Sequence, residues 1–110
     1  MKIDIAKDFS DTPWGRYPDD GDFCGEIFRK KFLLPNLKNA SVSDPLIIKI
    51  DGAEGFGSSF LEEAFGGLVR LDKIDPAKLK SIIKIENEKS SFQMYVKLIW
   101  KYIEEAASQE

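Results

Sequence analysis

The stretch Ile47–Leu68, IIKIDGAEGFGSSFLEEAFGGL, joins the patterns of a strand, a tight loop and a helix. The apolar run at Leu46–Asp51 predicts a buried strand. Glycines crowd the loop that follows, and Ser58 or Ser59 then opens a helix. That helix carries one apolar face, made of Leu61, Ala64, Phe65 and Leu68. A strand that passes through a short loop into a helix is the unit from which parallel sheets are built.

The flanking sequence continues this alternation. Period-2 patterning predicts a further strand at Lys2–Ala6, and the run IIKIE makes Ile82–Glu86 another strand candidate. Helical spacing and capping signals predict helices at Cys24–Leu34, from Asp75-Pro76 to Lys80, and at Ser90–Ala107. Residues 10–22 form a loop in which the Asp20-Gly21 turn signal allows a short hairpin around Arg16-Tyr17.

Composition excludes several classes of chemistry. The chain has 110 residues and a net charge of −3, whereas nucleic-acid binders usually carry a basic excess. It has no histidine and one cysteine, Cys24, so imidazole catalysis, histidine-ligated metals and multi-cysteine metal sites are ruled out. We therefore expect a binding module without metal or cofactor.

The same sequence indicates the compartment. No signal-peptide pattern opens the chain, and no window approaches the length of an apolar membrane span. With one thiol and no export signal, we expect a cytoplasmic protein that has no membrane or nucleic-acid partner.

The loop before the central helix is the main candidate site, made of Gly55, Gly57, Ser58 and Ser59. A helix start presents free backbone N–H groups and the positive end of the helix dipole, which suit an anion or a partner. The bland alternative is a capping box, in which Ser59 and Glu62 satisfy each other's backbone N–H groups. No Lys follows Gly57, so the loop is not a phosphate loop of the GxxxxGK[ST] kind.

The run Gly57-Ser58-Ser59-Phe60-Leu61 resembles the signature of STAS domains, found in sulfate transporters and anti-sigma-factor antagonists. The whole chain resembles more closely a bacterial family of STAS-like domains of unknown function. That resemblance is carried by Ile5–Tyr17, Asp20–Pro35 and Ile50–Leu68. It implies a single STAS-like α/β domain over residues 1–110. Its sheet would be mixed and four- to five-stranded, with three to four helices packed mainly on one face.

The resemblance also implies a signalling role. In STAS antagonists a partner kinase of the GHKL ATPase type phosphorylates a serine, and the matching residue here is Ser59, with Ser58 beside it. The classical Asp before the serines is Gly57 in this chain, and the classical Gly after them is Phe60. Because added charge at a flat interface is costly to desolvate, phosphorylation at Ser59 would act as a switch.

Aromatic residues near the turn are candidate partner contacts. Phe56 and Phe60 flank the serines, while Trp14, Arg16 and Tyr17 lie in a loop bounded by proline and glycine. Trp, Tyr and Arg are enriched at interface hot spots, although large aromatic side chains more often bury.

Several charged residues are expected to be solvated. Glu62 and Glu63 diverge on a helix and so form no acid–base pair, and Arg29, Lys30 and Lys31 suit a basic outer helix face. Asp19–Asp22 reads as a solvated turn, because it lacks the ligand spacing of a calcium loop.

The favoured function is a non-enzymatic protein-interaction module. One alternative is a small-anion or nucleotide binder, which would use the glycine-rich turn together with Arg16 as a clamp. A second is an enzyme of unknown type, for which the sequence offers no nucleophile paired with a base. A homo-oligomer built through the last helix is compatible with all three interpretations.

Overall fold

A computed structural model describes residues 1–108 of the chain. Within these residues, strands β1 (Lys2–Asp4), β2 (Leu46–Lys49) and β3 (Ile83–Glu86) form a parallel sheet in the order β1-β2-β3. Ile48 of β2 lies opposite Ile3 of β1 and Ile85 of β3. The strands are rich in isoleucine because a β-branched side chain fits the pleated surface of a sheet.

Helical segments make both crossovers and close the fold. Between β1 and β2, one consecutive segment consists of α1 (Gly25–Phe28), a π-helical turn (Arg29–Leu33) and α2 (Leu34–Leu37). Between β2 and β3 lie α3 (Ser58–Leu61), a π-helical turn (Glu62–Gly66), α4 (Gly67–Arg70) and α5 (Pro76–Ile82). After β3 comes α6 (Gln93–Ser108), and the remaining helical turns are Ile5–Phe9, Pro18–Asp20 and Ser90–Phe92.

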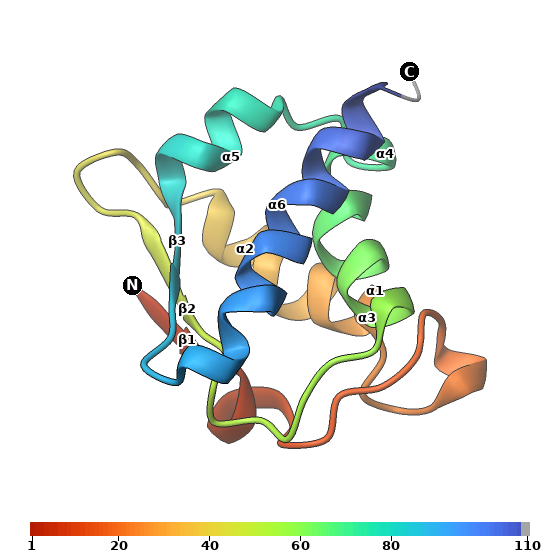
Figure 1. Ribbon diagram of the computed structural model, residues 1–110. Helices are drawn as coiled ribbons and strands as arrows, with labels where there is room; N and C mark the ends of the chain where they lie inside the picture. Colours follow the sequence, from red (N-terminus) through yellow and green to blue (C-terminus); the bar gives the residue numbers. More distant parts are fainter. Residues whose placement is uncertain (109–110) are drawn as a thin grey trace.

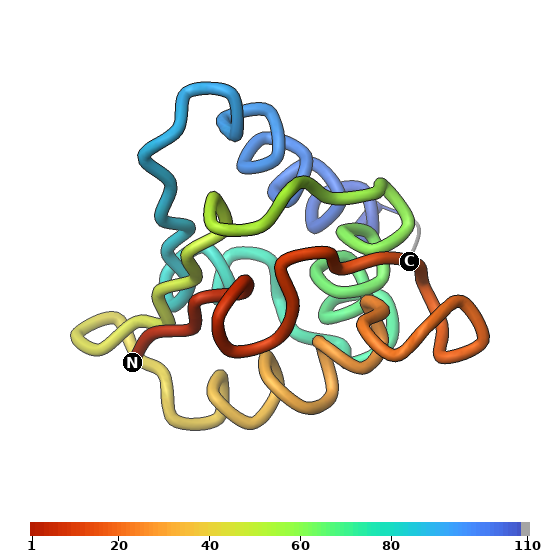
Figure 2. Tube along the Cα trace, turned by 90° about the horizontal axis from the view of Figure 1, so that it is seen from below, coloured from red at the N-terminus to blue at the C-terminus, as the bar shows by residue number. Residues whose placement is uncertain are grey.

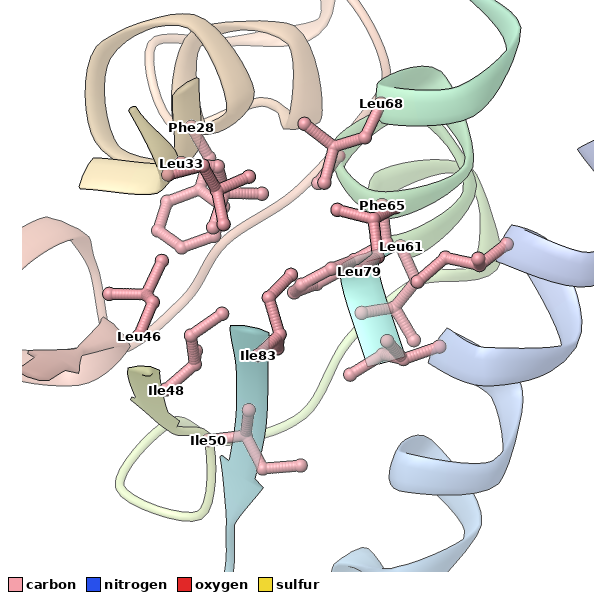
Figure 3. Packing of buried hydrophobic residues seen from close by; sticks show 14 of the residues in the cluster. Phe28, Leu33, Leu46, Ile48, Ile50, Leu61, Phe65, Leu68, Leu79 and Ile83 are labelled. Carbon is pink, nitrogen blue, oxygen red and sulfur yellow. The ribbon is translucent and has the colours of Figure 1, made fainter. Parts of the chain in front are cut away.

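The helices gather on one side of the strands (Figure 1). Burial along β2 agrees, because Leu46 and Ile48 are fully buried whereas the alternating Ile47 and Lys49 are partly exposed. Figure 3 shows the side chains of this buried face meeting those of the helices, among them Phe28, Leu33, Leu61, Phe65, Leu68 and Leu79. The prediction of an α/β fold is confirmed.

The prediction of a four- to five-stranded mixed sheet is wrong, because the described residues form three strands, all parallel. The sequence of residues 10–22 allowed a short hairpin around Arg16-Tyr17, and this hairpin does not form. Instead, the carboxylate of Asp20 accepts the backbone N–H groups of Arg16 (2.9 Å) and Tyr17 (3.2 Å). These donors are therefore occupied, and the chain folds into a 3₁₀ turn at Pro18–Asp20. No helix in the described part of the chain is long and apolar enough to cross a membrane.

Candidate functional site

The N-terminal loop lies alongside the segment that leads into α3. Figure 2 shows the red N-terminal chain running next to the yellow-green one. The backbone N–H of Glu54 donates to the carbonyl of Asp11 (2.8 Å), which fixes this contact. The ring of Trp14 lies over Gly57, where an added Cβ would be 3.4 Å from the ring atom Cζ3. A glycine at this position therefore lets the indole approach the backbone of the turn closely.

Trp14 separates two open hollows. The larger, of about 480 Å³, is lined by Thr12, Pro13, Trp14, Glu54, Gly55, Phe56 and Gly57. The smaller, of about 290 Å³, is lined by Trp14, Gly15, Asp20, Gly57, Ser58 and Ser59. The structure thus brings together the glycine-rich turn, both candidate serines and the candidate tryptophan, which are far apart in the sequence.

Ser58 and Ser59 are exposed, and neither hydroxyl makes a hydrogen bond with another residue of the described chain. The predicted capping box does not form. The helix begins at Ser58 with Gly57 as its N-cap, so Ser59 lies inside the first turn, where its side chain cannot cap. Glu62, the other half of the predicted box, instead pairs with Arg16 and Arg70 (2.8 Å to Arg70).

The aromatic candidates divide into exposed and buried. Trp14 is 66% exposed and Tyr17 is 49% exposed. Phe56 is half-buried, and its ring contacts those of Phe60, Phe92 and Tyr95. Phe60 is 0% exposed and packs against Phe9 and Phe28, so its assignment as a partner contact is wrong. Phe60, Ala64 and Leu68 recur at four-residue steps along one face of the helix. This spacing is typical of a buried helix face and explains why Phe60 lies in the core.

A buried ion cluster beneath the site was not anticipated. The carboxylate of Glu63 is 0% exposed and accepts from Nη1 of Arg29 (2.5 Å), a guanidinium that is itself 2% exposed. Arg16 and Arg70 also contact Glu63, at 3.2 and 3.6 Å. The predictions that Arg29 and Glu63 face solvent are therefore wrong. Each belongs to one of the π-helical turns, and π-helical turns often occur at functional sites.

The electrostatics of this cluster keep Glu63 charged. Burial by itself would raise the pKa of the Glu63 carboxyl, but hydrogen bonds and charge from Arg29, with Arg16 and Arg70, outweigh burial and lower that pKa. Nε of Arg29 also lies 3.0 Å from Asp72. A Cβ at Gly67 would stand 2.5 Å from Nη1 of Arg29, so this glycine makes room for the buried guanidinium.

Arg16 connects the cluster to the site. Its guanidinium hydrogen-bonds to Glu62 and Glu63. Burial lowers the pKa of Arg16, but these two carboxylates raise it by more, so its pKa lies above the ordinary value. The side chain thereby ties the N-terminal loop to the helix that starts at Ser58. Because the guanidinium of Arg16 is already paired with these carboxylates, it is poorly placed to bind an anion at the turn.

Cys24 and Asp51 have structural roles. Cys24 is free and buried at the N-cap of α1. Asp51 follows β2, and its carboxylate accepts the backbone N–H groups of Glu88 (2.5 Å) and Lys89 (3.0 Å). Burial raises the pKa of Asp51, but these hydrogen bonds lower it further than burial raises it. Within residues 1–108 no group of three or more Cys, Asp or Glu side chains could hold a metal ion.

A family model, the STAS-like domain of unknown function (DUF4325), matches residues 24–93. The chain belongs to this family. The matched segment contains the turn, both serines and the Arg29–Glu63 pair. Trp14, Arg16 and Tyr17 precede it. No curated protein and no solved structure matches the chain.

Proposed function

We propose that this STAS-like domain is a non-enzymatic regulatory module that docks a protein partner. The docking surface consists of Trp14, Tyr17 and the turn Gly55–Ser59, and we call it the Trp14 surface. The observation that carries the proposal is the largely exposed indole of Trp14 standing between two hollows. Large aromatic side chains usually bury, and exposed ones near concave surface are the common anchors of protein interfaces.

The chemistry around the serines favours binding over catalysis. A serine nucleophile needs a base within hydrogen-bond reach, and neither Ser58 nor Ser59 bonds to a carboxylate or an amine of the described chain. The nearby carboxylates Glu62 and Glu63 are engaged by arginines. Such an arrangement suits recognition, in which the hydroxyls are presented to another protein.

Phosphorylation of Ser59, or of Ser58 beside it, is the regulatory step in this proposal. A kinase needs an accessible hydroxyl, and both serines are exposed, with no hydroxyl partner among residues 1–108. Phosphate would add about −1.5 to −2 charge beside the backbone N–H groups of the helix start. The resemblance to STAS antagonists implies a serine kinase of the GHKL ATPase type as the partner. The added charge would lie in the docking surface and would change the affinity there.

Affinity capture from the native lysate tests the proposal. The baits are wild type, Ser59→Asp and the uncharged control Ser59→Ala, and mass spectrometry identifies both the bound proteins and the modified serines. We expect a specific partner on wild type and Ser59→Ala, in an amount that differs on Ser59→Asp. Equal capture by all three baits with both serines unmodified would remove the switch. No specific partner on any bait would contradict the docking function.

A further inference from the structure

We propose that the partner segment that docks on the Trp14 surface is basic, with arginine or lysine side chains entering the two hollows. This inference rests on the proposed docking function and adds the chemistry of the partner. It is carried by the aromatic and apolar lining of the hollows together with the charge around them.

The lining of the hollows suits long cationic side chains. Trp14 lines both hollows and is largely exposed, and a cation over the face of an aromatic ring is stabilised by the quadrupole of that ring. Pro13, Trp14 and Phe56 give the larger hollow apolar walls. The methylene stems of lysine and arginine pack on apolar walls of this kind while their charged ends reach the rim.

The rim carries the opposite charge. Glu54 lines the larger hollow and Asp20 the smaller. Asp11 accepts the backbone N–H of Glu54 through its carbonyl, and the backbone N–H of Trp14 donates to the carbonyl of Phe23, next to Asp22. Asp20 and Glu54 are exposed, and so are three acidic residues that adjoin these segments in the chain or through the backbone hydrogen bonds: Asp11, Asp19 and Asp22.

Within the described residues these carboxylates have no paired cation, and only that of Asp20 accepts hydrogen bonds, from the backbone N–H groups of Arg16 and Tyr17. None of the five forms an ion pair with another residue in the described part of the chain, and the adjacent Arg16 is engaged by Glu62 and Glu63. The unpaired side-chain charges beside the hollows are therefore negative, and a surface of one charge sign attracts a segment of the opposite sign.

The charge of the partner also determines whether phosphorylation strengthens or weakens binding. A phosphate on Ser59 would add negative charge beside Asp20, which lines the same hollow. For a basic partner we expect the added attraction to exceed the cost of desolvating the added charge. Ser59→Asp should therefore bind the partner more tightly than Ser59→Ala.

NMR titration of the full chain tests the inference. The probe is a short synthetic peptide of alternating arginine and serine, and its control replaces every arginine by the neutral isostere citrulline. We expect the arginine peptide to shift the indole N–H of Trp14 and the amides of Gly55–Ser59, and the citrulline peptide to shift neither. The indole N–H of Trp100, which lines neither hollow, should stay in place; Trp14→Ala assigns the two signals.

A matched pair of variants separates local from overall charge. Asp11→Asn with Glu54→Gln should weaken binding of the arginine peptide about three- to tenfold, because Glu54 lines the larger hollow, Asp11 adjoins it, and each change removes one exposed charge. Glu88→Gln with Glu105→Gln changes the total charge equally, at exposed positions outside both hollows, and should leave the affinity within about twofold. Equal weakening by the two double variants would overturn the inference.

Three other results would also overturn it. One is that the arginine peptide does not bind, and another is that its shifts map outside the Trp14 surface. The third is concentration-dependent self-association that Trp14→Ala abolishes, since a second copy of the chain would then occupy the hollows. If the peptide fails but Trp14→Ala still loses the partner captured from lysate, the docking function stands and only the basic chemistry is wrong.

Discussion

Replacing Glu63 by glutamine removes one charge from the buried cluster while keeping the shape of the side chain. Glu63 is fully buried and Arg29 nearly so, and their polar atoms are 2.5 Å apart. Removing one partner of a buried pair costs about 3–5 kcal/mol, because the other charge stays buried. Asp72 remains 3.0 Å from Nε of Arg29, so we expect the lower end, about 3 kcal/mol. Domains of this size are stable by about 5–15 kcal/mol.

Urea unfolding followed by circular dichroism measures this loss. With a slope of about 1.5 kcal/mol per molar urea, the midpoint of Glu63→Gln should fall by about 2 M. The control is Glu104→Gln, which breaks the exposed pair with Lys80 and should cost less than about 1 kcal/mol. If Glu63→Gln costs no more than this control, the buried cluster does not stabilise the fold as argued.

Three further perturbations test the account of stability. Gly25→Ala would place a Cβ 2.6 Å from the carbonyl oxygen of Phe60. The resulting overpacking should cost about 1–3 kcal/mol and lower the melting temperature, although alanine favours helix more than glycine does. An unchanged or raised melting temperature would contradict the close approach. Asp75→Ala removes the side chain that caps α5 at the N–H of Ala77, and should cost about 1 kcal/mol in urea unfolding, whereas an unchanged midpoint would show that the cap is dispensable. The pKa values of Glu63 and Asp51 are lowered in the folded state, so their stabilisation is complete above the ordinary carboxyl pKa of about 4 and is lost as the pH falls through the folded values. The urea midpoint should therefore drop below about pH 4, less steeply in Glu63→Gln, and identical slopes would refute the role of Glu63.

The sequence was sufficient for the elements that follow simple periodicity. The strand expected at Leu46–Asp51 is observed at Leu46–Lys49, and the helix expected at Ser90–Ala107 as α6, from Gln93 to Ser108, after a 3₁₀ turn. These segments depend on apolar spacing, which is a local property. The extra strands came from family resemblance and an Asp-Gly turn signal. Where the hairpin was expected, the Asp20 carboxylate accepts the backbone N–H groups of Arg16 and Tyr17 instead. Local sequence patterns do not reveal this contact.

The sequence pointed to the turn of the candidate site but not to the buried ion cluster beside it. The turn and its serines were found because glycines and helix-start residues carry a local signature. Arg29 and Glu63 were assigned to solvent, because charged residues are almost never fully buried unless paired, and pairing is tertiary. One signal was available: Phe60, Glu63 and Gly67 recur at three- and four-residue steps, which places Glu63 on an inward face beside a residue without a side chain.

The central claim is that a partner docks on the Trp14 surface, and isothermal titration with the captured partner tests it most directly. Trp14→Ala is compared with Leu71→Ala, another exposed apolar residue, which follows α4 and lines neither hollow. A hot-spot tryptophan contributes about 2 kcal/mol or more, so we predict that Trp14→Ala raises the dissociation constant about thirtyfold while Leu71→Ala leaves it within about twofold. Equal affinities for wild type and Trp14→Ala would contradict the account.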